Sequence, residues 1–388
     1  MIKVADRLGD VREYYFSIKL KQLAQMRKAG VDVINMGIGS PDMAPHDDVI
    51  AALNVASANM TNHGYQSYSG IPELRQAFAK WYATYFDVQL DADKEILPLI
   101  GSKEGIMHIA MTYLQAGDEV LLPNPGYPTY RSASKLTGAT LRTYTLTAEN
   151  AWLPDLDLLE KEGLTQLKLM WINYPHMPTG TKGNAVFFEK LIALAKKYNF
   201  LIVNDNPYAF VLNEEQLSIL SIPGAKEVAL ELNSLSKSHN MAGWRVGMLA
   251  GAAHYIKNVL RFKSNMDSGM FKPAQLAAVK ALSLPQKWYD DLNQEYRERR
   301  ALVFELADIL GCSYDENQVG LFVWAKVPEH YKNGYELSDK ILEKTGVFIT
   351  PGGVFGTGGD CYIRFSLCNK TAILREAKER VVHEMTEE

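Results

Sequence analysis

The sequence predicts an α/β fold with a large domain, built on a mostly parallel seven-stranded sheet flanked by helices, and a smaller α+β domain. Between residues 95 and 252, short apolar runs alternate with amphipathic helical stretches. This alternation is the order of elements that builds a parallel sheet. Several of the runs are apolar at every position, as in strands that are covered on both faces.

Seven segments are expected to form this sheet, and helices are expected between them. A helix is indicated, for example, by the helical spacing of the apolar residues between Phe187 and Tyr198. Sheets of this kind bind ligands at the carboxyl ends of their strands, so the residues that follow each strand are the candidates for a site. The seven segments are 95–101, 119–123, 140–146, 167–174, 200–205, 228–236 and 246–252.

The pattern changes after Ala252. A long helical pattern comes first, then the alternating segments 319–327, 346–352 and 361–367, and then a charged final helix. We expect a smaller α+β domain from this C-terminal part together with the N-terminal segment. The predicted division is an N-terminal arm at 1–35, a large cofactor-binding domain at 36–275 and a small domain at 276–388.

Composition narrows the class of protein. The chain has 388 residues, 47% hydrophobic and 22% charged, with a net charge of −4, which disfavours a general nucleic-acid or membrane-surface binder. No apolar run has the roughly 20 residues of a membrane span, and no signal peptide is visible. Three cysteines without a CxxC pair argue against disulfides and zinc. We therefore expect a cytoplasmic protein without a metal site, nucleic-acid partner or membrane partner.

Residues that could take part in binding or catalysis follow three of the predicted strands. The motif "GSKEG", from Gly101 to Gly105, begins a helix and could bind a phosphate through its backbone N–H groups. An ordinary capped helix start would have the same sequence pattern. Asp205 ends an apolar strand, where a carboxylate needs a cationic partner unless the loop is solvated. Lys237 follows another strand, and Arg245 lies eight residues further along the chain. A lysine by itself is usually a surface charge. A desolvated lysine near another cation, however, has a lowered pKa and can act as a nucleophile.

These three features match one cofactor. Pyridoxal 5'-phosphate needs an anchor for its phosphate, a carboxylate that keeps its pyridine nitrogen protonated, and a lysine that forms a Schiff base. Because the three places end strands of one predicted sheet, we expect them to meet at one edge. The sequence therefore points to a pyridoxal-phosphate enzyme.

With these residues in view, the sequence resembles the class I aminotransferases, which are pyridoxal-phosphate enzymes of fold type I. The resemblance extends from about residue 35 to residue 367 and is specific because its motifs occur as an ordered set. The motifs are "GIGSPD", "YQSYSGIPELR", "GSKEG", "PNPGYPTY", "PTG", "NDNPY", "SKSHNMAGWRVG" and "IRFS".

The resemblance implies roles around the cofactor. Lys237 would form the Schiff base and carry the proton between the substrate's α-carbon and the cofactor. Asp205 would pair with the pyridine nitrogen, Tyr208 would bond the ring's phenolic oxygen, and Tyr127 would stack on the ring. The residues expected at the phosphate are Ser102, Lys103, Ser234 and Arg245.

The resemblance also implies how substrates and a second subunit enter the site. Arg364 would grip the substrate's α-carboxylate with its planar guanidinium, and Gly39 would let that carboxylate approach the backbone. Tyr65 would reach the phosphate of the neighbouring subunit, so a homodimer with shared sites is expected. The implied substrates are an amino acid and a 2-oxo acid, exchanged in a ping-pong reaction.

One position departs from the family pattern. The family usually has an asparagine before the proline of "PTG", and its amide bonds the phenolic oxygen; here the residue is Met177. A thioether cannot donate a hydrogen bond, and one lost bond to a charged oxygen costs roughly 1.5–3 kcal/mol. Either His176, Asn173 or a water replaces the donor, or Met177 fills an apolar gap while Tyr208 and Arg364 suffice.

Two other functions compete with an amino-acid aminotransferase. A pyridoxal-phosphate carbon–sulfur lyase of the same fold differs in needing no 2-oxo acid acceptor. A transcription regulator with an aminotransferase-like sensor would need a DNA-binding module, and the 34 residues before the match are too few for one. The sequence does not name the amino donor, because specificity lies in loop side chains and in residues of the other subunit. No second arginine is placed for a distal carboxylate, so a dicarboxylic donor is not established.

Overall fold

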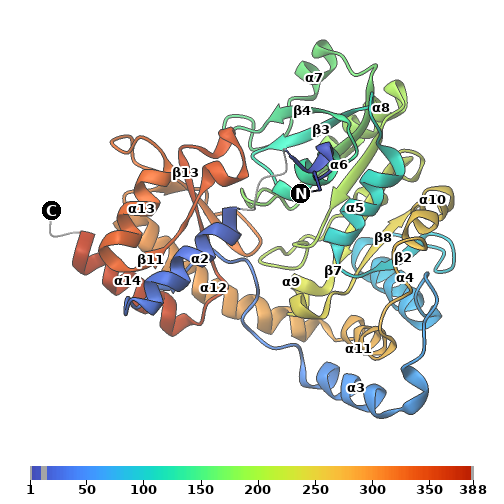
Figure 1. Ribbon diagram of the computed structural model, residues 1–388, viewed down its shortest axis with the longest axis horizontal. Helices are drawn as coiled ribbons and strands as arrows, with labels where there is room; N and C mark the ends of the chain where they lie inside the picture. Colours follow the sequence, from blue (N-terminus) through green and yellow to red (C-terminus); the bar gives the residue numbers. More distant parts are fainter. Residues whose placement is uncertain (1, 10–14, 386–388) are drawn as a thin grey trace.

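The computed structural model describes residues 2–9 and 15–385, so residues 1 and 10–14 of the predicted arm and the last residues 386–388 lie outside the description. Two parts are visible in Figure 1, with the C-terminal orange and red elements on one side and the large sheet on the other. None of the described helices combines the length and hydropathy needed to cross a lipid bilayer.

The larger part is built on a seven-stranded sheet, and each of the seven predicted segments contributes a strand. Every neighbouring pair is parallel except those formed by β8, which is antiparallel to β2 and β7. The prediction of a mostly parallel sheet is thereby confirmed. In spatial order the strands are β2 (Ile96–Leu99), β8 (Gly247–Gly251), β7 (Ala229–Ser234), β6 (Leu201–Asp205), β5 (Leu167–Ile172), β3 (Glu119–Asn124) and β4 (Thr140–Thr145).

Helices cover both faces of this sheet. In β5, Leu169 and Trp171 face one apolar core while Met170 and Ile172 face the other, which explains why the strand reads as apolar at successive positions. The first core is completed by α5 (Ser102–Tyr113), α6 (Pro128–Leu136) and α10 (Ala253–Lys263). The second is completed by α3 (Asp47–Ala58), α4 (Pro72–Phe86), α7 (Leu156–Glu162), α8 (Ala185–Tyr198) and α11 (Lys272–Leu282).

The smaller part has its own sheet and core. An antiparallel sheet runs in the order β12 (Thr350–Pro351), β13 (Tyr362–Ser366), β10 (Phe322–Lys326) and β9 (Ser313–Tyr314). It packs with α12 (Gln286–Ile309), α13 (Gly334–Thr345) and α14 (Thr371–Met385). The sequence did not predict β9, since two residues leave no periodic signal.

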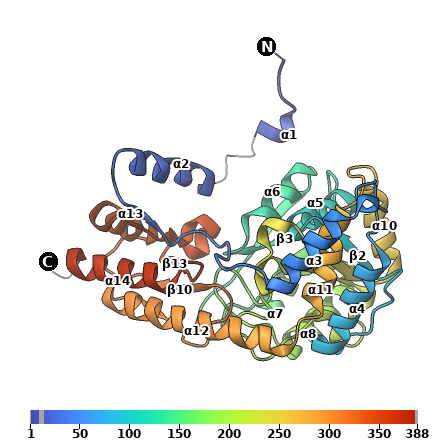
Figure 2. The same ribbon diagram turned by 90° about the horizontal axis from the view of Figure 1, so that it is seen from below.

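The N-terminal segment packs with the smaller part, as predicted. Strand β1 (Ile34–Asn35) pairs in parallel with β11 (Val347–Phe348). Helix α2 (Tyr15–Lys28) lies along the same side in Figure 1, while the short α1 (Asp6–Gly9) touches α6. The position of α2 beside the smaller part is also visible from below (Figure 2). The division at residue 275 stays a prediction; α11, which contains this residue, packs against α3 and α4.

The topology brings the candidate residues to one edge of the large sheet. The carboxyl ends of β2, β6 and β7 lie at this edge because these strands run in the same direction. Since β8 runs the opposite way, its beginning lies there too. The segments around Gly101, Asp205 and Lys237 therefore meet Arg245, which precedes β8.

Candidate active site

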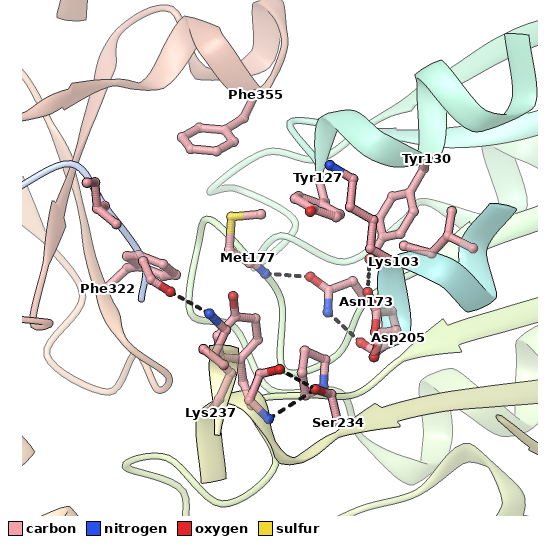
Figure 3. Close-up of a pocket in the computed structure, with 18 of the residues that line it drawn as sticks. Lys103, Tyr127, Tyr130, Asn173, Met177, Asp205, Ser234, Lys237, Phe322 and Phe355 are labelled. Carbon is pink, nitrogen blue, oxygen red and sulfur yellow. Dashed lines mark hydrogen bonds between the residues drawn. The ribbon is translucent and has the colours of Figure 1, made fainter. Parts of the chain in front are cut away.

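A cavity of about 540 Å³ lies at this edge, and side chains of the smaller part form one of its walls (Figure 3). All of the predicted site residues except Tyr65 line it. The side chain of Tyr65 is 94% exposed and lies outside the cavity of its own chain. The lining residues that were predicted are Gly39, Ser102, Lys103, Tyr127, Asp205, Tyr208, Ser234, Lys237, Arg245 and Arg364.

The turn before α5 forms a cradle for an anion. Gly101 has φ 79°, and a Cβ at this position would lie 2.1 Å from Nη2 of Arg245, so only glycine lets the guanidinium approach. Ser102 and Lys103 are the first residues of α5, where backbone N–H groups and the helix dipole favour negative charge. Arg245 is held in place by donating from Nη1 to the carbonyl of Ala242 at 2.8 Å.

Asp205, the last residue of β6, is buried with one carboxylate oxygen left open. Its Oδ2 accepts a hydrogen bond from the hydroxyl of Tyr130 at 2.8 Å, while Oδ1 has no hydrogen-bond partner among the described residues. Burial raises the pKa of this carboxyl from 3.8 to about 7. An open, buried carboxylate oxygen of this kind fits a protonated ring nitrogen, whose charge would favour the ionised form.

Tyr130 is a site residue that the sequence reasoning missed. Its ring stacks on Trp171 at 5.2 Å between centroids, and this packing fixes the hydroxyl against Asp205. The sequence could have indicated it, because Tyr130 follows Tyr127 by three residues at the start of α6. Residues at this spacing lie on one side of a helix, and both rings line the same cavity.

Lys237 lies in the short helix α9 (Leu235–Ser238), which Ser234 caps by accepting from the backbone N–H of Ser236 at 3.0 Å. Its Nζ donates to the carbonyl oxygen of Gly39. Burial lowers the pKa of Lys237, and the neighbouring Arg364 and Arg245 lower it further. The side chain is therefore biased toward the neutral amine, which is the nucleophilic form.

Arg364, on β13, reaches the cavity from the smaller part. Its guanidinium carbon lies 3.8 Å from the ring centroid of Phe322 and 4.6 Å from that of Phe355. Its Nη2 donates to the carbonyl of Gly37 at 2.8 Å, and Nη1 lies 3.3 Å from Sδ of Met177. The two phenylalanines were not predicted, because an aromatic residue in an alternating strand or a glycine-rich loop reads equally well as core.

Neither Asn173 nor His176, the two candidates near Met177, has a side chain placed to replace the hydrogen-bond donor of the expected asparagine. Asn173 lines the cavity, but its amide nitrogen donates to the carbonyls of Asp205 and Pro175 and its oxygen accepts from the N–H of Met177. His176 does not line the cavity; its ring contacts Thr179 and burial lowers its pKa to about 3. The geometry does not support the hypothesis that either residue replaces the donor.

Each chemical feature of pyridoxal phosphate thus has a matching group in this chain. The glycine turn suits the phosphate, the open oxygen of Asp205 suits the pyridine nitrogen, and Lys237 suits the aldehyde. Together with a doubly covered sheet and a second α+β part, the site defines a pyridoxal-phosphate enzyme of fold type I.

Comparison with known proteins gives the family. Residues 31–381 match the model of the family described as aminotransferase class I and II. The LL-diaminopimelate aminotransferase of Maridesulfovibrio salexigens is 41% identical over 98% of each chain. Among solved structures, apo-BacF from Bacillus subtilis is 33% identical with a TM-score of 0.94 over 98% of each chain. A probable N-succinyldiaminopimelate aminotransferase from Thermus thermophilus is 32% identical with a TM-score of 0.87, over 95% of this chain and 100% of that one.

The chain therefore belongs to the class I and II aminotransferases. It is an amino-acid aminotransferase that depends on pyridoxal phosphate, as the sequence predicted. The roles of the individual site residues remain predictions, which the geometry above makes specific.

Replacing Asp205 with Asn is expected to stabilise the cofactor-free protein at about pH 8. The folded pKa of about 7 lies above the unfolded value of 3.8, so the unfolded chain ionises first and wild-type stability falls as the pH rises between these values. The loss amounts to roughly 4 kcal/mol above the folded pKa, and Asn removes it. Thermal unfolding at about pH 5 and pH 8 measures the effect, with the exposed Asp157→Asn as control. A variant less stable than wild type at the higher pH would contradict the assignment.

Proposed function

We propose that Lys237 is the covalent anchor and proton carrier of this aminotransferase and that Arg364 binds the α-carboxylate of its substrates. The observation that carries the proposal is that the two side chains enter one cavity from the two parts of the structure. An amino acid that extends from Lys237 to Arg364 would present its α-carbon to the lysine. This orientation is what removal of the α-proton requires.

The remaining lining residues have roles that follow from their surroundings. Bound pyridoxal phosphate supplies an electron sink for the negative charge that develops at the α-carbon. Asp205 would keep the ring nitrogen protonated and Tyr127 would lie on the ring face. Tyr208 would donate to the phenolic oxygen. The residues proposed to hold the phosphate are Ser102, Lys103, Ser234 and Arg245.

The lysine has a defined resting position when it is not joined to the cofactor. Its Nζ then donates to the carbonyl of Gly39, which keeps the amine inside the cavity. Because burial and two arginines lower its pKa, Nζ can accept the α-proton of a substrate and return it one step later. Gly39 also lets the Phe322 ring pack against the backbone, since a Cβ there would lie 2.4 Å from that ring.

For the substrate, we propose LL-diaminopimelate as the first candidate. The support is the printed name of the curated relative that is 41% identical over nearly the whole chain. A second candidate is an amino acid with an apolar side chain. It is favoured by the apolar lining residues of the cavity, which include Leu20, Ile38, and the Phe322 and Phe355 that contact Arg364.

A half-reaction screen tests the reaction and the role of Arg364 together. Cofactor-bound enzyme is mixed with LL-diaminopimelate and with each common amino acid, without acceptor, and conversion of the cofactor is followed by absorbance. Arg364→Gln is expected to raise the KM for the accepted donor about 100-fold, since a charged fork is lost. The exposed Arg131→Gln is the control.

The same assay separates an aminotransferase from a lyase. Continuous turnover is expected only when a 2-oxo acid is supplied, because a transamination needs an acceptor for the amino group. Continuous release of ammonia and sulfur product without an acceptor would instead identify the carbon–sulfur lyase. An unchanged KM in Arg364→Gln would refute the proposed carboxylate site.

We also propose that two copies share their active sites in a cytoplasmic homodimer. Tyr65 is 94% exposed, and Tyr68, Met266 and Phe271 nearby are also exposed. The two loops that carry these residues pack together, because a Cβ at Gly269 would lie 2.6 Å from the carbonyl of Gln66. A second subunit that covers this surface would receive Tyr65 at its phosphate site.

A reducing compartment is supported by the three free cysteines, Cys312, Cys361 and Cys368.

Mixed dimers test whether Tyr65 acts in the neighbouring site. Lys237→Ala and Tyr65→Ala are each expected to be strongly impaired alone. When the two are unfolded and refolded together, mixed dimers regain one site with both residues intact. Statistical pairing then gives about a quarter of the wild-type activity. Activity that stays at the mean of the two separate variants would show that Tyr65 serves no partner site.

Replacing Met177 with Asn is expected to lower, by about 1–2 pH units, the pH at which the cofactor-bound enzyme changes colour. The new amide would donate to the ionised phenolic oxygen and withdraw negative charge from it, so the proton on Nζ of the cofactor-bound Lys237 would be held less tightly. A spectrophotometric pH titration measures the shift, with the exposed Met60→Asn as control. No shift, or a shift upward, would mean that Met177 does not stand where the amide would.

A further inference from the structure

The segment between β1 and α3 supports both functional cations of the cavity. We call residues 36–44 the strap, because it crosses from the smaller part to the larger part. The carbonyl of Gly37 accepts from Nη2 of Arg364 at 2.8 Å, and the carbonyl of Gly39 accepts from Nζ of Lys237. A displacement of the strap would therefore move the resting positions of both side chains.

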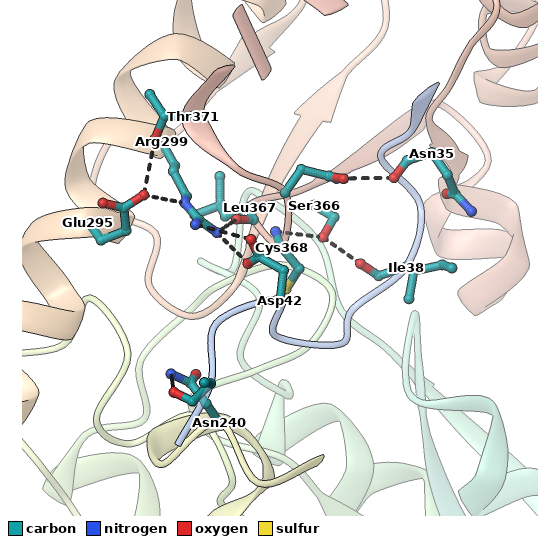
Figure 4. A network of polar contacts seen from close by, with 12 residues as sticks. Asn35, Ile38, Asp42, Asn240, Glu295, Arg299, Ser366, Leu367, Cys368 and Thr371 are labelled. Carbon is teal, nitrogen blue, oxygen red and sulfur yellow. Dashed lines mark hydrogen bonds and ion pairs between the residues drawn. The ribbon is translucent and has the colours of Figure 1, made fainter. Parts of the chain in front are cut away.

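The strap is held at one point by a nearly buried ion pair. Nη1 and Nη2 of Arg299 lie 2.6 and 3.2 Å from Oδ1 and Oδ2 of Asp42 in the strap, in a two-pronged contact (Figure 4). The side chain of Arg299 is 3% exposed and that of Asp42 is 22% exposed. Planar pairing of this kind fixes orientation as well as distance.

Arg299 ties the strap to the strand that carries Arg364. Its Nη1 also donates to the carbonyl of Leu367, which lies just beyond the end of β13, at 3.1 Å. Its Nε donates at 2.9 Å to Glu295, one turn earlier on α12, and the same Glu295 oxygen accepts from Thr371 at the start of α14. One guanidinium thus joins the strap, α12, the end of β13 and α14.

Further contacts keep the strap close to β13. The hydroxyl of Ser366 donates to the carbonyl of Ile38 at 2.6 Å, and its backbone N–H donates to Met36 at 2.9 Å. On the other side, Asn240 donates to the carbonyl of Ala44 at 3.2 Å, from the loop that follows α9. Asp42 lies between these two sets of bonds, where a shift of the chain would be transmitted in both directions.

We propose that Arg299 is a positioning residue for recognition of the substrate carboxylate. Through Asp42 and Leu367 it sets the distance between the strap and β13, and so it aligns the guanidinium of Arg364 with the cavity. The inference rests on the proposed role of Arg364. It goes beyond that role because Arg299 does not line the cavity.

The opposing interpretation is that Arg299 only holds the fold together. A purely structural pair would affect stability and cofactor content, and any loss of activity would follow the loss of folded enzyme. A positioning residue instead weakens carboxylate binding while the chemical step proceeds at its normal rate once substrate is bound. The split between KM and kcat therefore distinguishes the two.

Arg299→Gln is expected to raise the KM for each donor accepted in the screen, with LL-diaminopimelate tried first, about tenfold. The kcat should fall less than threefold, and the absorbance of the bound cofactor should be unchanged. Arg299→Lys retains the charge but not the fork, so an intermediate KM is expected. Lys287→Gln is the control, because it removes an exposed ion pair from the same helix.

Asp42→Asn tests whether Arg299 acts on the position of Arg364 through its ion pair with Asp42. If Arg299 acts through Asp42, the two substitutions are not additive, and the double variant Asp42→Asn/Arg299→Gln has the KM of the worse single variant. Should Arg299→Gln fail to fold, Arg299→Lys and Asp42→Asn carry the same test. Equal losses in kcat and in bound cofactor with an unchanged KM would overturn the proposal.

The outcomes for Arg299 and Arg364 are separable. If Arg364→Gln leaves the KM unchanged, the proposed carboxylate site is wrong and the positioning inference falls with it. If Arg364→Gln raises the KM while Arg299→Gln and Asp42→Asn do not, the carboxylate site stands and only the positioning role is refuted.

Discussion

The site depends on one buried carboxyl group, that of Asp205. Removing a carboxylate from water is costly unless a cation or hydrogen-bond donors replace the solvent, and here one hydroxyl serves one oxygen while the other stays open. The surrounding structure is arranged to hold this unfavourable group in place. Tyr130 is fixed by stacking on Trp171, and Asn173 donates to the backbone carbonyl of Asp205 itself.

A second buried carboxyl on the neighbouring strand shows what the open oxygen means. Glu231 on β7 is fully buried and its pKa is also raised by burial. Its two oxygens accept from Tyr82, Ser218 and Asn204 at 2.8 to 3.0 Å and from the backbone N–H of Ile219 at 3.1 Å. Burial is therefore common to both carboxyl groups. The difference is that both oxygens of Glu231 have donors within the fold, whereas Oδ1 of Asp205 has none among the described residues, as the proposed pairing with a ring nitrogen requires.

The sequence predicted the large sheet and its first candidate site residues for the same physical reason, and the family resemblance supplied the other candidates. Strands covered on both faces must be apolar at successive positions, so their limits are visible, and a polar residue at such a limit is conspicuous. Asp205 and Lys237 were found in this way. The tertiary contacts were not predictable by this route. Tyr130 reads as an ordinary core tyrosine, and the pair of Asp42 and Arg299 joins residues 257 positions apart. The role of Tyr65 depends on a second chain that one sequence does not place.

The surroundings of two buried arginines, Arg299 and Arg364, also differ. Arg299 meets Asp42 and Glu295, so its charge is balanced by the fold and its position is fixed. Arg364 instead contacts a backbone carbonyl, a thioether and the faces of two aromatic rings. A carboxylate would add a charge-assisted, two-pronged contact to these, which is the reason that Arg364 is proposed as the carboxylate site. Met177 is part of this arrangement, because its thioether sulfur is only a weak acceptor for Nη1 of Arg364.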